Sequence, residues 1–274
     1  MRRIALLAGL LLLLGLVSCG GTVDNGPVVT VETVCAAEDR PEQLNLTYDT
    51  VRVELPGNEA AEERINADLA LLAEEAAERC EKMIRLCEGG DGFDSYYFRQ
   101  QIRLMRADRA VISFRICRVY YYAGAAHGGY TYSGVTYDAK TGDRLTLDML
   151  GEEARASAIT QATALAEAYE AFYRAGHDGL SCFDDYRQDI PKLLVNDERF
   201  YLTEDGLTFA NGAFQLSSSY GTSEPLFFTV GYDGVSEAYR MKKDDIYILD
   251  GEGHLLYPDG TAAYDMDRAE QLFS

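Results

Sequence analysis

The chain has no tryptophan, three histidines, and 25 basic residues against 45 acidic ones. A formal net charge of −20 repels DNA, RNA and anionic lipid headgroups, so we expect no nucleic-acid partner. The same field would steer a cationic partner toward the protein, although it could equally serve only to keep the protein soluble. Without tryptophan the chain lacks the best stacking platform for a sugar, which shifts the expected ligand from sugar toward protein.

Catalytic and metal-binding signatures are also missing. No GxSxG, HExxH, P-loop or GxGxxG sequence stands in its required context, so we predict a protein that is not an enzyme and uses no cofactor. No CxxC pair or Cys/His cluster has zinc spacing, so we predict no metal site. Calcium between Asp138 and Asp148, or between Asp250 and Glu252, stays open as an alternative, but neither stretch matches an EF-hand loop.

The N-terminus combines a basic start, an apolar run and a cysteine. Arg2 and Arg3 precede an almost unbroken apolar run, residues 4–17, which is too short for a spanning helix. The sequence LVSC that ends at Cys19 resembles the lipobox of bacterial lipoproteins, which implies cleavage before Cys19 and lipid such as palmitate on the protein. An ordinary secretory signal is the alternative. Removing residues 1–18, which contain two arginines and no acid, changes the formal charge from −20 to −22.

We therefore predict an extracytoplasmic protein, held on a bacterial cell membrane by the lipid anchor at Cys19. Residues 1–18 are the lipoprotein signal peptide, and residues 19–43 are a tether, within which residues 28–34 could add a strand. Residues 44–235 form one compact domain, because no repeat or low-complexity block divides them. Residues 236–274 form a C-terminal β-hairpin extension.

Hydrophobic periodicity predicts the fold of the domain. Residues 44–55 alternate as a strand with a bend or bulge near Asp49, and a helix runs from Asn58, its N-cap, to about Leu86. Residues 95–106 and 108–122 read as a strand hairpin, and a further strand begins at Tyr130. A second helix covers residues 152–173. Its expected inner face is made of Ala156, Ile159, Thr163, Ala166, Tyr169 and Tyr173. The expected class is α+β, with a largely antiparallel sheet and two main helices packed on one face.

Five cysteines follow Cys19, and an odd number leaves at least one thiol free or in an intermolecular bond. They are Cys35, Cys80, Cys87, Cys117 and Cys182. Cys80 and Cys87 stand about two helical turns, ~10 Å, apart in the first helix, too far to bond to each other. Cys117 lies within a strand and is most simply a small core residue.

The sequence GAAHGG between two strands is the candidate binding site. Gly124, Gly128 and Gly129 allow backbone conformations or close approaches that a Cβ would forbid. His127 lies among them, and it either locks this corner by hydrogen bonds to backbone carbonyls or takes part in proton transfer. Tyr130 and Tyr132 continue the strand; they are half-buried sheet residues or ligand contacts with an apolar face and a polar tip.

These segments support a resemblance to a known family. TYDTVRVELPG, Ile65-Asn66 in the long helix, the GAAHGG corner, DAKTGDRLTLDML, FYLTEDGLTF and PLFFTVGYDGV follow in that order. Over about residues 44–235 they resemble the extracytoplasmic domain of RsiV-type anti-sigma factors, which is also found in PdaC-type peptidoglycan deacetylases. The RsiV domain is a lysozyme receptor, so the resemblance implies recognition of a cationic wall hydrolase or of wall material. Since no sigma-binding or deacetylase domain is expected here, neither signal relay nor deacetylation follows.

Two hypotheses about function result. The first is a membrane-anchored binding lipoprotein that captures a cationic wall-active protein such as lysozyme, or cell-wall material such as peptidoglycan. The second is a peptidoglycan-directed enzyme or accessory module that uses His127 with a nearby acid. The missing catalytic signatures favour the first.

Overall fold

The structure, a computed structural model, describes residues 26–37, 43–88, 95–126, 128–174, 186–195, 200–210, 227–241, 248–249, 255–256 and 262–264. The predictions for Cys19, the signal peptide, His127 and Cys182 fall outside these ranges. The helices and strands, in chain order, are β1 Val28–Cys35, β2 Leu44–Glu54, α1 Glu59–Glu88, β3 Tyr96–Ala107, β4 Val111–Tyr121, β5 Gly129–Asp138, α2 Leu147–Leu150, α3 Ala154–Arg174, α4 Tyr186–Val195, β6 Phe200–Leu202, β7 Leu207–Ala210, β8 Phe227–Val230, β9 Ile248–Leu249, β10 Leu255–Leu256 and β11 Ala262–Tyr264.

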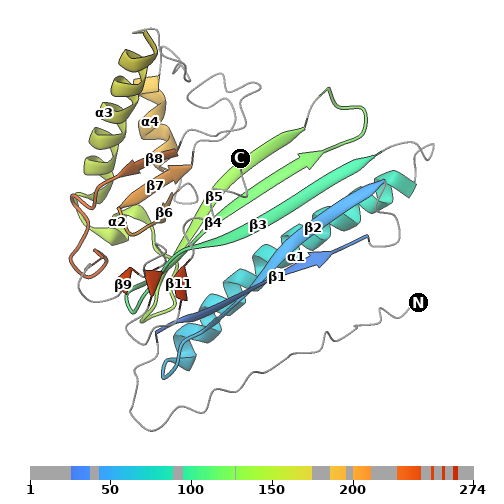
Figure 1. The fold of residues 1–274 in the computed structure, drawn as a ribbon, viewed down its shortest axis with the longest axis horizontal. Helices are drawn as coiled ribbons and strands as arrows, with labels where there is room; N and C mark the ends of the chain where they lie inside the picture. Colours follow the sequence, from blue (N-terminus) through green and yellow to red (C-terminus); the bar gives the residue numbers. More distant parts are fainter. Residues whose placement is uncertain are drawn as a thin grey trace.

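Strands β1 to β5 form the main sheet, and their order in the sheet is their order in the chain (Figure 1). Neighbouring strands pair antiparallel, except that β2 and β3 run parallel from Leu44 opposite Tyr96 to Tyr48 opposite Gln100. Parallel neighbours need a long crossover connection, and α1 supplies it. The sequence analysis allowed for a strand at residues 28–34 within the tether. This strand is present as β1, and it pairs with β2 along its whole length.

Asp49 marks the point where β2 parts from β3. One carboxylate oxygen of Asp49 accepts a hydrogen bond from the backbone N–H of Ile102 in β3 at 2.8 Å, and the other accepts from the Thr33 hydroxyl at 2.7 Å. The side chain therefore replaces a backbone acceptor where the parallel pairing ends. The β1–β2 register runs through Asp49 without a shift, so this pairing contains no bulge where the sequence predicted a bend or bulge.

Helix α1 lies lengthwise along β2 on one face of the sheet (Figure 1). Its inward positions follow the three- and four-residue spacing expected of an amphipathic helix. They are Ala61, Ile65, Leu69, Ala76, Cys80, Met83 and Cys87. The Asn66 amide fixes the helix to β2, because its oxygen accepts from the Val53 N–H at 2.8 Å and its nitrogen donates to the Val53 carbonyl at 2.7 Å.

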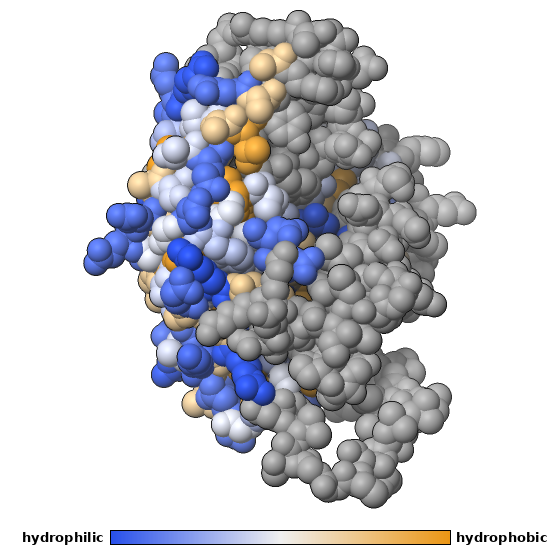
Figure 2. All heavy atoms as spheres, turned by 60° about the vertical axis from the view of Figure 1, so that its left-hand side comes forward, coloured by the Kyte–Doolittle hydropathy of each residue, from blue (hydrophilic) through white to orange (hydrophobic). Residues whose placement is uncertain are grey.

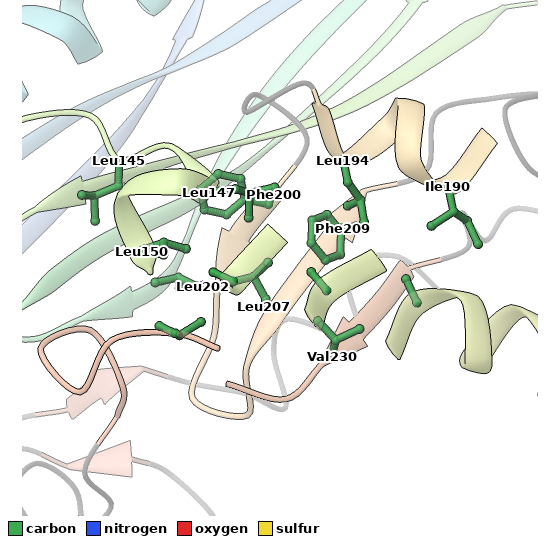
Figure 3. Close-up of a cluster of buried hydrophobic side chains, with 14 of the residues drawn as sticks. Leu145, Leu147, Leu150, Ile190, Leu194, Phe200, Leu202, Leu207, Phe209 and Val230 are labelled. Carbon is green, nitrogen blue, oxygen red and sulfur yellow. The ribbon is translucent and has the colours of Figure 1, made fainter. Parts of the chain in front are cut away.

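A second unit packs on the other face of the sheet, at the end near the β3–β4 hairpin. It consists of the β6-β7-β8 sheet with α2, α3 and α4 around a shared apolar core (Figure 3). Leu147 and Leu150 of α2 point toward Phe200 and Leu202 of β6 in this core. Since each of these elements has one apolar side, the unit buries those sides against one another.

Gly134 in β5 allows the two units to meet. A Cβ at this position would lie 2.0 Å from the carbonyl oxygen of Phe200, so only glycine lets β6 approach β5 this closely. Beside this contact, the Ser113 hydroxyl lies 2.8 Å from the Thr136 hydroxyl and accepts a hydrogen bond from the Leu202 N–H at 2.8 Å. The Ser113 hydroxyl and the Leu202 N–H, which lie between the two units, thus each have a partner.

A buried ion pair joins the β3–β4 hairpin to the segment after β8. Arg106 Nε lies 2.6 Å from an Asp108 carboxylate oxygen, and the two side chains are 1% and 2% exposed. Arg106 also donates to the Tyr232 hydroxyl at 2.8 Å and to the Tyr239 carbonyl at 2.7 Å. Tyr239 follows residue 235, the predicted domain boundary, and its hydroxyl donates to Asp138 at 2.9 Å. Residues 236–241 therefore pack into the body of the domain.

The predicted α+β class is confirmed, with α1 and α3 as the long helices. The two helices do not share one face of the main sheet, because α1 covers one face and α3 packs on β8 in the unit on the other face. Of the expected inner face of α3, Ala166 is buried as predicted, but the phase was wrong at Ala156 and Ile159. Ala156 is exposed and Ile159 is only half-buried, whereas every fourth residue from Ala154 to Ala166 is buried. Alanines at this spacing let the helix backbone approach β8 closely, so close packing decided which side faces inward.

Candidate functional site

The glycine corner joins β4 to β5 at the end of the sheet far from α3 (Figure 1). It begins with a turn in which the Ala125 N–H donates to the Tyr122 carbonyl at 3.0 Å, and Gly124 has a φ of +80°. That value lies in the left-handed region, which favours glycine. His127, between Ala126 and Gly128, lies outside the described residues, so its role in the corner stays a prediction.

Gly128 and Gly129 are required by the packing of Tyr120. A Cβ on Gly128 would lie 2.9 Å from the Tyr120 carbonyl oxygen, and one on Gly129 would lie 2.6 Å from the Tyr120 ring. This ring lies among others on the face of the sheet that α1 covers, 6.0 Å from that of Tyr122. All three predicted glycine positions, Gly124, Gly128 and Gly129, thus have a structural explanation that needs no ligand.

Tyr130 and Tyr132 lie on the opposite face of the sheet, with ring centroids 5.8 Å apart. Tyr132 is only 7% exposed and packs with Cys117 and Tyr201. Burial raises the pKa of Tyr132, and its hydrogen bond with Cys117 adds to that shift. Tyr132 is therefore a packing residue in this conformation. Tyr130 is half-buried and keeps part of its ring accessible.

The turn between Asp138 and Asp143, within the most specific part of the family resemblance, is held by its own hydrogen bonds. Asp138 accepts from the Lys140 N–H at 2.7 Å and the Thr141 N–H at 3.0 Å. The Asn58 side-chain amide donates from the start of α1 to the Lys140 carbonyl at 2.9 Å. Gly142 has a φ of +77°, and a Cβ there would lie 2.7 Å from the carbonyl oxygen of α1 residue Ala61. These residues stabilise the fold.

The outer side of α1 carries an acidic patch, which we define as Glu74, Glu75, Glu78, Glu81 and the apolar Leu71. The four glutamates are exposed, and Leu71 is 56% exposed. Residues three and four apart on a helix are neighbours, so the patch is one continuous surface. Glu81 lies 3.4 Å from Arg85, Glu75 lies 3.8 Å from Arg118, and the exposed Lys82 follows Glu78 by one turn on the same side of the helix. These exposed or half-exposed basic residues neutralise the patch in part.

The four cysteines in the described residues differ in their exposure to solvent. Cys80, Cys87 and Cys117 are buried and Cys35 is exposed, and the thiols of Cys35, Cys80 and Cys117 are free. Burial raises the pKa of the Cys80 thiol to about 12, so Cys80 is inert at neutral pH. The prediction that Cys117 is a core residue is confirmed.

Side chains able to bind a metal do not gather in threes anywhere in the described ranges. Among the helices of the described residues, none is long and apolar enough to cross a membrane. On the side of α3 and β6 to β8, hydrophilic residues predominate and hydrophobic ones form only small patches among the atoms drawn in colour (Figure 2).

A comparison with solved structures finds this architecture in bacterial proteins. A DUF3298 family protein from Pseudomonas aeruginosa PAO1 superimposes with a TM-score of 0.52 and 14% identity, over 80% of this chain and 99% of its own. The chain has a DUF3298-type fold. A DUF3298 member from Bacteroides fragilis NCTC 9343 aligns with a TM-score of 0.44 and 18% identity, over 76% of this chain and 89% of its own. No protein-family model and no curated protein matches the sequence.

The similarity to DUF3298 proteins supports the fold that the predicted resemblance implied. At 14% identity it concerns the fold alone, so the RsiV-type assignment and its ligand stay predictions. Sequence reasoning named the glycine corner as the site and missed the acidic patch as a local surface. The sequence pattern did indicate this patch, because its residues recur at helical spacing on the side of α1 opposite the predicted inward residues. They include Leu71, Glu74, Glu78 and Glu81.

Proposed function

We propose that this protein is a lipid-anchored extracytoplasmic binding protein, related to RsiV-type domains, that captures a cationic wall-active protein of the lysozyme class. It acts by binding, without catalysis. The observation that carries the proposal is the acidic patch of α1, where four exposed glutamates follow an exposed leucine along the helix.

The patch supplies both parts of a protein interface. Its charge adds to that of an acidic chain, which raises the rate at which a cationic partner arrives. Leu71 adds exposed apolar area beside Glu74 and Glu75, at the N-terminal end of the patch. The helix beneath is held by its buried face and by Asn66, so the patch is preorganised and loses little conformational entropy on binding.

The test is binding of the full chain to lysozyme, measured by calorimetry and by association kinetics over a range of salt concentrations. The variant Glu74→Gln, Glu78→Gln, Glu81→Gln should lower the association rate about tenfold at low salt, and added salt should remove the difference. The matched control neutralises three exposed acids elsewhere, and it should change the rate far less. These are Glu152, Glu153 and Asp233.

Two results would count against the proposal. One is no detectable binding to lysozyme at low salt. The other is equal slowing by the patch variant and the control variant, because that would mean that only the overall charge matters.

A further inference from the structure

Strand β1 forms one edge of the main sheet, and no described strand pairs with its outer side (Figure 1). The Ala36 N–H donates to the Leu46 carbonyl at 2.9 Å, in line with the β1–β2 register. In an antiparallel ladder, residues that bond to the neighbouring strand alternate with residues whose N–H and C=O groups point away from it. The backbone groups of the odd-numbered residues of β1 therefore point to the open side. These residues are Val29, Val31, Thr33 and Cys35.

The partner strand β2 supports this assignment independently. Val53 lies opposite Val29, and both its N–H and its carbonyl bond to the Asn66 side chain of α1. Val29 and Val53 are thus a non-hydrogen-bonded pair, in which the backbone groups of each residue point away from the other strand. Contacts at both ends of β1 therefore identify the same row of open backbone groups.

Strand β1 lacks the features that protect an edge strand from pairing. Protected edges carry lysine, proline or a bulge, or another segment covers them. The sequence of β1, VVTVETVC, has neither lysine nor proline, and its register with β2 has no shift. Val28 is 49% exposed and Val31 is 41% exposed. The opposite edge, β5, is covered in part, because β6 approaches it at Gly134.

We propose that β1 pairs antiparallel with β1 of a second copy of this chain, so that the two main sheets join into one. The strand is self-complementary in the two-fold register that places Val31 opposite Val31. In this register the open backbone groups of Val29 meet those of Thr33.

The side chains fit the same register. The exposed Val28 faces Val34 of the other copy, and Glu32 faces Thr30, so no like charges meet. One of the two neighbouring two-fold registers would place Glu32 opposite Glu32, where like charges repel. Since Glu32 is the one charged residue of β1, this edge offers little to the cationic partner that the acidic patch of α1 suits. It suits a second strand of the same kind.

The length of chain before β1 is compatible with two copies on one membrane. The eight residues of β1 span about 27 Å, and the N-terminal ends of two antiparallel copies lie at opposite ends of the pair. Residues 19–25 reach at most about 24 Å, so both ends of a pair that lies along the membrane can connect to it. Anchoring in one plane raises the effective concentration of each copy for the other. Only this gain depends on the lipid anchor proposed above.

The experiment measures the mass of the full chain in detergent by sedimentation equilibrium, over a range of protein and salt concentrations. We expect a dimer that added salt strengthens, because each copy carries a formal charge of −20 and salt screens their repulsion. Salt should weaken lysozyme binding, so the two proposals can fail separately. Val31→Pro removes an open N–H from each copy and should raise the dissociation constant at least about tenfold. An edge strand tolerates proline where the N–H is not bonded within the sheet.

Cysteine cross-linking then locates the interface. Cys19, Cys35 and Cys182 are first replaced by serine. In that background Val31→Cys should form an intermolecular disulfide on mild oxidation, because opposite residues of a hydrogen-bonded pair have Cα atoms about 5.5 Å apart. Val29→Cys is the matched control, the same substitution in the same open row. The two copies of residue 29 would be about 13 Å apart along the strands, too far for a disulfide.

Four results would overturn the proposal. They are a single-chain mass under all conditions, a dimer that Val31→Pro leaves unchanged, equal cross-linking of Val31→Cys and Val29→Cys, and a monomer that binds a synthetic peptide of residues 27–35. The last result would assign the edge to an extended peptide. Thermal unfolding checks the folding of Val31→Pro, and the two cysteine variants decide the matter if that variant is unstable.

Discussion

The buried Arg106–Asp108 pair should carry a large share of the domain's stability. Its oxygen–nitrogen distance is 2.6 Å, and both side chains are almost fully removed from water. Asp108→Asn leaves the Arg106 charge buried without its counter-charge, and breaking such a pair costs roughly 3–5 kcal/mol. The arginine keeps its hydrogen bonds to Tyr232 and to the Tyr239 carbonyl, which places the expected loss near the lower end, ~3 kcal/mol.

Asp108→Ala should cost more than Asp108→Asn. The other carboxylate oxygen of Asp108 accepts from the Ala110 N–H at 2.7 Å and the Val111 N–H at 2.8 Å, and asparagine can replace this oxygen while alanine cannot. Each buried donor left without an acceptor costs about 1–3 kcal/mol, so the alanine variant should lose ~5 kcal/mol in total. That is comparable to the whole free energy of unfolding of a marginally stable domain, about 5–15 kcal/mol.

Urea unfolding followed by circular dichroism gives these free energies directly. The control is Arg52→Ala, which breaks an exposed pair with Glu54 at 3.6 Å and should cost less than ~1 kcal/mol. The reasoning fails if Asp108→Asn costs no more than Arg52→Ala, because a pair isolated from water cannot then be what holds the hairpin in place.

Three further predictions concern single positions. Burial raises the pKa of Tyr232 from 10.0 to about 12. The stability that the protonated Tyr232 hydroxyl contributes is therefore complete below pH ~10 and is lost as the pH rises toward 12. Between these pH values the urea midpoint of Tyr232→Phe should fall less than that of the unmodified protein. Gly134→Ala should destabilise by more than ~2 kcal/mol because its Cβ would meet a β6 carbonyl at 2.0 Å, whereas Gly231→Ala, where the nearest atom is at 3.4 Å, should be tolerated in the same unfolding assay. Cys35 should react with a thiol reagent in the native protein and Cys80 only after unfolding, and mass spectrometry of the labelled peptides would contradict this if Cys80 were modified first.

The sequence predicts best those elements whose pattern is local. Helix α1 shows a regular apolar spacing from Ile65 to Cys87 and begins right after Asn58, so its position and inner face could be recognised. The side chain of Asn58, however, donates to carbonyls of the turn that contains Lys140. The chain pattern identified the N-terminal end of the helix but not this tertiary contact, because the contact depends on residues 82 positions away.

Two features could not be read from periodicity. The buried side of α3 consists of alanines such as Ala158, and a hydrophobic pattern gives more weight to Ile159 beside it. The pairing of Arg103 with Arg115 depends on a register shift in β3 between Leu104 and Arg106. If the register of the hairpin end continued without this shift, Arg103 would face Ile116, and a register that differs by one residue presents the other face of the strand.

Because the five main strands occupy the sheet in the sequence in which they are synthesised, each new strand finds its neighbour already present. No later segment has to be inserted between earlier ones, so assembly can proceed from the N-terminus as the polypeptide lengthens. Within the main sheet, the connection that spans the most residues is the crossover from β2 to β3, so β3 can pair with β2 only after the whole of α1 has been synthesised.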